Sequence, residues 1–362
     1  MRSSSEADWQ RFLGQPDSDP ATSRFEFAHA GQCVLITGAG GSIGSALAKA
    51  VAGAGVRQLL LLDSSEMSLF QLQEEIAGNF EDVALEVVLG SIGDAGLLDS
   101  LFRHHQIDVI YHAAAWKQVA LLEANPFAAV KNNSIGTHTL AQAAIRGGVP
   151  QLVLVSTDKA VNPRGIMGAS KRIAELAVTS FSSAACRMNA IRLCNVIGSS
   201  GSVVPIFLRQ IEQRKPVTVT DPGVSRWFLT IRQTIEAILA CGASEQEGKI
   251  LLPPVGPPVR IADLAQFLIR AAGNGWPGEM VYIGLRPGEK LTEELIFENE
   301  HKLEVEGCLT VLETPTLRAG ELSALIGELG DRIQLRDLPG MLRTIRSVVP
   351  EYQPGERLAL WK

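Results

Sequence analysis

The chain has 362 residues, with 33 Lys and Arg against 39 Asp and Glu, which gives a formal net charge of −6. Hydrophobic residues at 46% and charged residues at 20% are typical of a soluble globular protein and exclude a disordered chain. The acidic balance argues against nonspecific binding of nucleic acid. No apolar run is long enough for a membrane span or a signal peptide, so the expected location is the cytoplasm.

The five cysteines and six histidines are scattered along the chain and lack the close spacing of zinc or disulfide sites. We therefore expect the cysteines to be small buried side chains in a reducing compartment. The same dispersion predicts that the protein has no metal site.

The first 30 residues are polar and rich in turn-forming residues, which predicts a loose lead-in. From residue 31, short Val-, Ile- and Leu-rich runs alternate with longer amphipathic stretches, the pattern of a doubly wound α/β fold with a buried parallel sheet. The predicted strands are 33–37, 58–62, 84–89, 108–112, 151–155 and 189–193. The predicted helices are 42–54, 66–78, 95–105, 125–146 and 168–181.

After about residue 200 this alternation ends, and prolines interrupt shorter mixed segments. We expect residues 31–200 to form a Rossmann domain and residues 201–362 to form a smaller mixed lobe, with some segments returning to the main domain. Two late helices are predicted at 319–329 and 335–348.

The first predicted strand leads into the segment TGAGGSIG at 37–44, which opens a helix. Gly38 allows a tight turn, Gly41 lets the main chain approach a pyrophosphate, and Gly44 permits close packing of helix on strand. Asp63 ends the next strand, where a carboxylate accepts the ribose hydroxyls of a dinucleotide and repels a 2′-phosphate. No Arg or Lys follows immediately, so NAD is favoured over NADP.

The strand predicted at 151–155 ends in Ser156, Thr157, Asp158 and Lys159, on the edge of the sheet that faces the cofactor crevice. The spacing to Lys171 is similar to the short-chain dehydrogenase pattern Ser/Thr…Tyr-x-x-x-Lys. The position of the tyrosine, however, holds methionine. The adjacent Asp and Lys offer an acid and a base, although a surface ion pair on a turn fits the spacing equally well.

Together these motifs resemble the CapD-like UDP-N-acetylglucosamine 4,6-dehydratases of bacterial polysaccharide biosynthesis, in the extended short-chain dehydrogenase/reductase superfamily. The resemblance covers roughly residues 10–362, and the stretch from Ser156 to Met167 is its most specific part. The matching segments are TGAGGSIGS (37–45), HAAAWK (112–117), NP (125–126), KNN (131–133), STDKAVNP (156–163), MGA (167–169), GSSGSVVP (198–205), RPGEK (286–290) and VPEY (349–352).

The resemblance implies that bound NAD⁺ takes a hydride from C4 of the sugar, that the C5 proton and the C6 hydroxyl are lost as water, and that the hydride returns to C6. It implies that Lys159 is the base at C5, Asp158 the acid at C6, and Thr157 the residue that positions the C4 hydroxyl. Lys171 would hold the nicotinamide ribose. Met167 in place of tyrosine is characteristic of the branch that retains configuration at C5.

The resemblance also implies two sets of binding residues. The cofactor-binding set is Gly38, Gly40, Gly41, Ser42, Ile43, Gly44, Asp63, Ser64, Ala113, Ala114, Ala115, Asn133 and Lys171. The substrate-binding set is Lys117, Asn195, Val204, Arg226, Arg286 and Glu289. The residues support the diphosphate contact independently, because a guanidinium in the turn at Pro287-Gly288 pairs with two phosphate oxygens at once.

The chain departs from the family pattern at Ser91, Trp116, Gln118 and Cys194, and it lacks the transmembrane helices that precede this domain in many members. Two alternatives remain open: a C5-inverting dehydratase or C4 epimerase of a nucleotide sugar, and a non-catalytic NAD-binding sensor. We expect a UDP-sugar as the small-molecule partner and a homo-oligomeric assembly.

Overall fold

The structure, a computed structural model, describes Trp9, residues 12–14, 29–80, 82–273 and 275–355, and Leu358. Within these residues the main domain is built on a nine-stranded sheet of order β14-β15-β11-β6-β5-β4-β1-β2-β3. Strands β3 to β11 in this order are parallel, and β15 and β14 extend the sheet as antiparallel strands. The bounds are β1 Cys33–Thr37, β2 Gln58–Asp63, β3 Ala84–Leu89, β4 Val109–His112, β5 Gln151–Thr157, β6 Arg187–Leu193, β11 Ile250–Leu252, β14 His301–Glu306 and β15 Leu309–Glu313.

The six predicted strands and the doubly wound α/β class are confirmed. Branched and aliphatic side chains make both faces of the central strands apolar, so each face needs a layer of helices. The strand order reverses between β1 and β4, which opens a crevice at the carboxyl ends of the strands.

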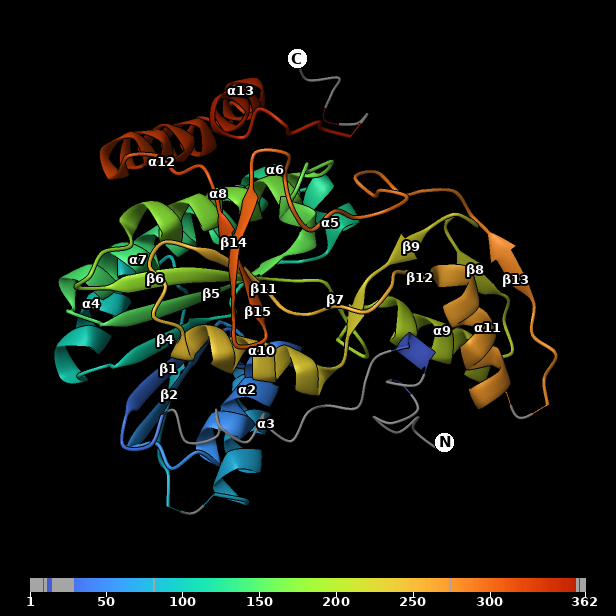
Figure 1. The fold of residues 1–362 in the computed structure, drawn as a ribbon, viewed down its shortest axis with the longest axis horizontal. Coiled ribbons are helices and arrows are strands. Elements are labelled where there is room, and N and C mark those ends of the chain that lie inside the picture. The colour runs from blue at the N-terminus through green and yellow to red at the C-terminus, as the bar shows by residue number, and fades with distance from the viewer. Residues whose placement is uncertain are drawn as a thin grey trace.

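Helices cover both faces of the sheet (Figure 1). One layer holds α2 (Ser42–Ala52), α3 (Glu66–Ala77) and α10 (Ile231–Ala243), and the other holds α4 (Ala95–His104), α7 (Gly136–Arg146) and α8 (Ile166–Phe181). The C-terminal helices α12 (Ala319–Gln334) and α13 (Leu338–Val348) lie outside α8 as a further layer, with a core cluster of their own between them and α8.

The helix predicted at 125–146 is formed, but not as regular α-helix. Helix α6 (Pro126–Ala129) continues into a π-helical turn, η2 (Val130–Ile135), before α7 begins. A π-turn inside an α-helix often lies at a functional site. Just before it, the short helix α5 (Val119–Glu123) places the carboxylate of Glu123 at the start of α8, where it accepts the N–H of Ile166 at 2.5 Å.

Residues after 201 belong to two bodies. The small lobe lies to one side of the sheet (Figure 1) and is formed by α9 (Val203–Glu212), β8 (Val217–Val219), β9 (Ser225–Arg226), β12 (Val259–Arg260), α11 (Ile261–Ala272) and β13 (Met280–Tyr282). The short parallel pair β7 (Asn195–Val196) and β10 (Phe228–Leu229) lies between the lobe and the main sheet. Helix α10 and strands β11, β14 and β15 belong to the main domain.

Most of the predicted lead-in lies outside the described residues. Of its described residues, Trp9 and Phe12 pack against Phe267 of α11, with ring centroids 5.5 and 4.3 Å from the Phe267 ring. No pattern in the sequence predicted this contact with the small lobe. Four cysteines are buried, as predicted, but Cys308 is exposed, because it lies in the tight turn between β14 and β15.

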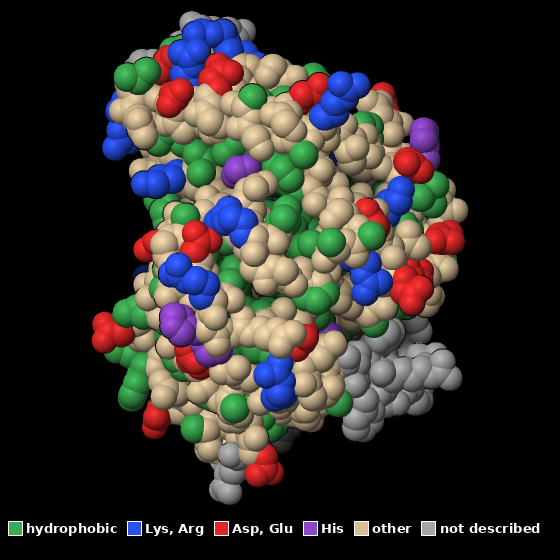
Figure 2. Space-filling view, turned by 90° about the vertical axis from the view of Figure 1, so that its left-hand side faces the viewer, with side chains coloured by type: hydrophobic (Ala, Val, Ile, Leu, Met, Phe, Trp, Pro, Cys, Tyr) green, Lys and Arg blue, Asp and Glu red, His purple; other side chains and the backbone are tan. Residues whose placement is uncertain are grey.

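The face of the main domain away from the small lobe carries interspersed charges of both signs (Figure 2). None of the described helices is long and apolar enough to cross a membrane.

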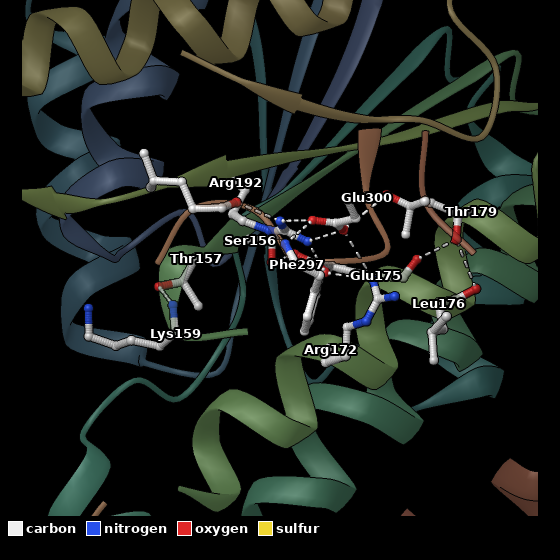
Figure 3. Close-up of polar contacts among 12 residues, drawn as sticks. Ser156, Thr157, Lys159, Arg172, Glu175, Leu176, Thr179, Arg192, Phe297 and Glu300 are labelled. Carbon is white, nitrogen blue, oxygen red and sulfur yellow. Dashed lines mark hydrogen bonds and ion pairs between the residues drawn. The ribbon is translucent and has the colours of Figure 1, made fainter. Parts of the chain in front are cut away.

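A buried ionic cluster ties the sheet to α8 and to the segment before β14 (Figure 3). The guanidinium of Arg192 on β6 donates to both oxygens of Glu175, at 3.0 and 2.9 Å, and to both oxygens of Glu300, at 2.8 and 2.9 Å. Arg172 adds a 3.1 Å bond to Glu175, and both guanidinium groups lie over the ring of Phe297. Burial alone would raise the pKa of Glu175, but the two arginines hold it below its usual range.

We predict that Arg192→Met lowers the free energy of unfolding by about 3–5 kcal/mol, because it leaves two carboxylates buried without their cation. Urea-induced unfolding measures this difference. Arg260→Met is the matched control, because it removes an arginine from the exposed pair with Asp263 and should change stability little. Equal losses in the two variants would contradict a special role for the buried cluster.

Candidate functional site

The glycine-rich loop between β1 and α2 has the close contacts that its glycines were predicted to allow. Gly38 has a φ of +69°, and a Cβ there would lie 2.5 Å from the main-chain N of Ala114. A Cβ on Gly44 would lie 2.1 Å from the carbonyl O of Gly38. The loop therefore packs tightly against the segment after β4, and Ser42 and Ile43 begin α2 with the N–H groups that an anion can bind.

Asp63, at the end of β2, lies beside this loop. Its Oδ2 accepts the N–H of Gly40 at 2.9 Å, and its Oδ1 accepts the N–H of Ser65 at 2.9 Å. Each carboxylate oxygen keeps a second lone pair, so the group still fits a ribose diol. Asp63 thus braces the loop as well as ending the strand, a second role that the sequence did not indicate. Ser64 follows it on the surface.

A cleft of about 250 Å³ opens at the carboxyl ends of β4, β5 and β6. Its walls come from the start of α2, the segment after β4, the end of β5, helix α8, strand β7 and the loop before α9. The lining residues are Ile43, Ala113, Ala115, Trp116, Lys117, Gln118, Val155, Ser156, Thr157, Lys159, Met167, Lys171, Leu193, Cys194, Asn195, Val196, Ser199, Gly201 and Ser202.

The predicted base, Lys159, lines this cleft, and the predicted acid, Asp158, is buried directly beside it. Strand β5 ends at Thr157, whose Oγ1 donates to Oδ1 of Asp158 at 3.0 Å. The same Oδ1 accepts from Nζ of Lys159 at 2.9 Å, and Nζ also donates to Oδ1 of Asn195 at 3.2 Å. Asp158 is fully buried, and its Oδ2 has no hydrogen-bond partner among the described residues. A surface ion pair is therefore the wrong interpretation of this sequence pair.

Helix α8 brings two predicted residues to the cleft on one face, because positions four apart share a face. Met167 lines the cleft where a tyrosine was expected from the general pattern. The Nζ of Lys171 donates to the carbonyl O of Val155 at 2.8 Å. Burial lowers the pKa of Lys171 to about 8, with Glu175 partly opposing the effect.

Asn133, in the π-helical turn, holds the segment after β4 in place. It is fully buried; its side-chain NH₂ donates to the carbonyl O of Trp116 and to Oγ of Ser170, both at 3.0 Å, and its Oδ1 accepts the N–H of Trp116 at 2.9 Å. Asn133 therefore shapes the wall formed by Ala113, Ala115 and Trp116 without itself lining the cleft. Ala114 packs against Gly38.

A second, smaller pocket of about 160 Å³ adjoins the first and shares Lys159, Met167 and Asn195 with it. Arg164, Arg226, Glu289, Lys290 and Glu293 supply its charged side chains. The sequence did not predict Glu293 as a site residue, because Glu293 stands next to Glu294 in an acidic stretch and belongs to no recognisable motif.

The predicted substrate residues fall into three groups. Lys117 and Asn195 line the cleft, and Glu289 and Arg226 line the second pocket. Arg286 is exposed in the turn that Gly288 closes with a φ of +81°, and it lines neither space. The side chain of Val204 is buried in the core of the small lobe.

Three comparisons with known proteins bear on the fold and the family. The fold is the Rossmann fold of the extended short-chain dehydrogenase/reductase type. The family described as "Polysaccharide biosynthesis protein" matches residues 34–312, and the chain belongs to this family.

Two curated relatives are 40% identical to this chain. One is the probable polysaccharide biosynthesis protein EpsC of Bacillus subtilis, matched over 293 residues, which are 80% of this chain and 49% of EpsC. The other is the capsular polysaccharide biosynthesis protein CapD of Staphylococcus aureus, matched over 271 residues, 74% of this chain and 45% of CapD. The chain therefore spans about half the length of these relatives.

Among solved structures, Pen from Bacillus thuringiensis has a TM-score of 0.74 and 30% identity, and the match covers 80% of this chain and 92% of Pen. Structures whose titles name a dTDP-glucose 4,6-dehydratase and a UDP-N-acetylglucosamine 4-epimerase share the fold at lower identity. Within the described residues, no cluster of His, Cys, Asp and Glu could hold a metal ion.

We predict that Asn133→Asp loosens the wall of the cleft, because a carboxylate cannot donate to Trp116 and Ser170. The buried acceptors left unpaired should cost about 1–3 kcal/mol of unfolding free energy. Hydrogen–deuterium exchange should show faster exchange at residues 113–118, whereas Asn125→Asp, at an exposed bond to the carbonyl of Leu121, should leave that segment unchanged. Unchanged exchange in both variants would contradict this role.

Proposed function

We propose that the protein catalyses the NAD-dependent 4,6-dehydration of a UDP-N-acetylhexosamine, UDP-N-acetylglucosamine in the first instance, with retention at C5. The product is a 4-keto-6-deoxy sugar nucleotide for polysaccharide or glycan biosynthesis. The observation that carries the proposal is the adjacent acid and base, Asp158 and Lys159. Lys159 lines a cleft that has methionine where the tyrosine is expected, and the buried Asp158 is bonded to it. An elimination needs both groups, one for each end of the bond that becomes unsaturated.

The residues present fit a bound NAD. The glycine loop leaves room for a pyrophosphate at the start of α2. The carboxylate of Asp63 lies beside this loop, where it would bind the adenosine ribose. NAD, when bound, supplies the chemistry of accepting a hydride from the sugar and returning it. The residues that would hold it are Gly38, Gly40, Gly41, Ser42, Ile43, Gly44, Asp63, Ser64, Ala113, Ala114, Ala115 and Lys171, with Asn133 behind the wall.

The chain's own groups then have separate roles. Thr157 positions the C4 hydroxyl of the sugar, and its own hydroxyl donates a hydrogen bond to Asp158. Asp158 gives a proton to the C6 hydroxyl as it leaves. Lys159, as a neutral amine, takes the C5 proton; the resulting ammonium exchanges with solvent and then delivers a proton to the same face of C5. Met167 carries no proton and fills space beside the sugar.

We propose different tasks for the residues that would bind the nucleotide. The exposed guanidinium of Arg286 and the ammonium of Lys117 are available for the diphosphate. The guanidinium of Arg226 already donates to the carbonyls of Ser225, Lys290 and Leu291, so we assign it to holding the loop. Asn195 and Glu289 would contact the sugar, and Val204 can offer only its main chain. A cytoplasmic location and a homo-oligomeric assembly remain predictions.

The tyrosines argue against the epimerase alternative. The three of them, all in the described part of the chain, lie away from the cleft. Tyr111 is buried and hydrogen-bonded to His29, Tyr282 is exposed on the small lobe, and Tyr352 is buried in the C-terminal segment. An epimerase or an inverting dehydratase that relies on a phenol has none here. Against a non-catalytic sensor, the base and Lys171 line one cleft, and the acid is bonded to the base.

The mechanism is tested by running the reaction with UDP-N-acetylglucosamine in heavy water. We predict loss of one water, deuterium at C5, none at C6, and no net reduced NAD. Lys159→Ala and Asp158→Asn should each lose about 10²- to 10⁴-fold in kcat while still binding NAD and UDP. Met167→Leu is the control of similar size and should cost far less. Deuterium at C6, or near-parent turnover by Lys159→Ala, would overturn the mechanism.

The cofactor choice is tested at Asp63. We predict that Asp63→Asn weakens NAD binding, because it removes charge-assisted hydrogen bonds of about 1.5–3 kcal/mol each, and narrows the preference for NAD over NADP. Titration calorimetry with both dinucleotides measures these changes. Glu66→Gln, an exposed carboxylate one turn away, is the control. A parent protein that prefers NADP would contradict the assignment.

A further inference from the structure

We propose that Glu293 is a positioning residue of the site: it lines the second pocket together with Lys159, and its carboxylate governs the pH range in which the Lys159 amine can act as a base. The inference deepens the proposed function, on which its catalytic part rests. Its electrostatic part concerns only the groups in this structure.

Glu293 is built into the pocket. It is 5% exposed, and its Oε2 has no hydrogen-bond partner among the described residues. The nearest cations are at ion-pair distance without a short bond: Nε of Arg226 lies 3.7 Å from Oε1, and Nζ of Lys290 lies 3.9 Å from Oε2. Its carboxylate therefore keeps acceptor capacity in a space whose wall includes Lys159.

The main chain around Glu293 is firmly held. Arg226 donates to the carbonyls of Lys290 and Leu291, and Nζ of Lys290 donates at 2.7 Å to the carbonyl of Val161, just beyond the catalytic turn. Two residues further along, the carbonyl of Leu295 accepts from Arg192. A loop tied at both ends orients its one buried carboxylate, whereas the side chain of Glu294 next to it is about half exposed.

The charged groups around the amine of Lys159 indicate how the carboxylate of Glu293 acts on its pKa. The groups that act on Lys159 are Asp158 and Glu293, which are acidic, and Arg226, which is basic; Lys159 in turn disfavours the charge on Lys117. Burial lowers the pKa of Lys159, but the two carboxylates outweigh it and hold the pKa above its ordinary value.

The groups that act on Glu293 are Lys159, Asp158, Arg226 and Lys290. Burial, with a contribution from Asp158, raises the pKa of Glu293, and the cations partly oppose this rise.

The sign of the effect follows directly. A base must be neutral, and a neighbouring carboxylate favours the charged ammonium. Removing the charge of Glu293 therefore lowers the pKa of Lys159 and lets the amine lose its proton at lower pH. The wild-type arrangement therefore favours the charged form of Lys159.

The experiment compares Glu293→Gln with Glu294→Gln, which removes the neighbouring, half-exposed carboxylate. Competitive acetylation of the whole protein over a pH series, with mass spectrometry of the peptide that contains Lys159, gives the midpoint at which the amine becomes reactive. We expect Glu293→Gln to move this midpoint down by about one pH unit and Glu294→Gln to leave it in place. Glu293→Asp, which keeps the charge on a shorter arm, should move it less than Glu293→Gln.

The same shift should appear in turnover. In Glu293→Gln the acidic limb of the kcat profile should move to lower pH, which is a gain of up to about tenfold at a fixed pH on that limb. An unchanged labelling midpoint in Glu293→Gln, or an equal shift in Glu294→Gln, would overturn the inference. A shifted midpoint in a protein that turns over no nucleotide sugar would support the inference and overturn the proposed function instead.

Discussion

The guanidinium of Arg192 is the interaction on which the site depends. It is fully buried and pairs with two buried carboxylates. Breaking one side of such a buried pair leaves an uncompensated charge, which costs far more than the pair itself contributes. Strand β6, helix α8 and the segment before β14 are therefore held in one mutual arrangement.

That arrangement bears on the geometry of the proposed catalytic residues. Glu175 lies one helical turn beyond Lys171 on α8, and it also accepts the hydroxyl of Ser156 at 2.6 Å, next to Thr157. Arg192 reaches Leu295, close to Glu293 on the same loop. A single cation thus connects the end of β5, helix α8 and the segment before β14; Figure 3 shows its bonds to Glu175 and Glu300. The proposed reaction would take place next to the buried cluster around Arg192, whose own charges are already paired.

The sequence predicted the fold well because the signals were local. Unbroken Val, Ile and Leu runs mark strands buried on both faces, and the glycine loop and the segment 156–163 carry their own spacing. The long-range contacts could not be predicted in this way. Arg192 looks like any polar residue in a strand, since its partners are separated from it by 17 and 108 positions. Glu293 is hidden among neighbouring acids, and Val204 matches a motif while its side chain faces the lobe core.

The distribution of charge explains how one cleft can serve both proton transfer and binding of an anion. Asp158 and Glu293 are buried near Lys159. Their negative charges therefore largely balance the positive charge of Lys159 at the place where proton transfer is proposed. The remaining cations, Lys117 and Arg286, lie towards solvent. Burial and the neighbouring Lys159 lower the pKa of Lys117. An anion that binds there stabilises the charged ammonium of Lys117, and this attraction adds to the affinity for the anion. A diphosphate held there would be kept away from the buried acids, which its charge would repel, and the uncharged sugar would be the part that reaches them.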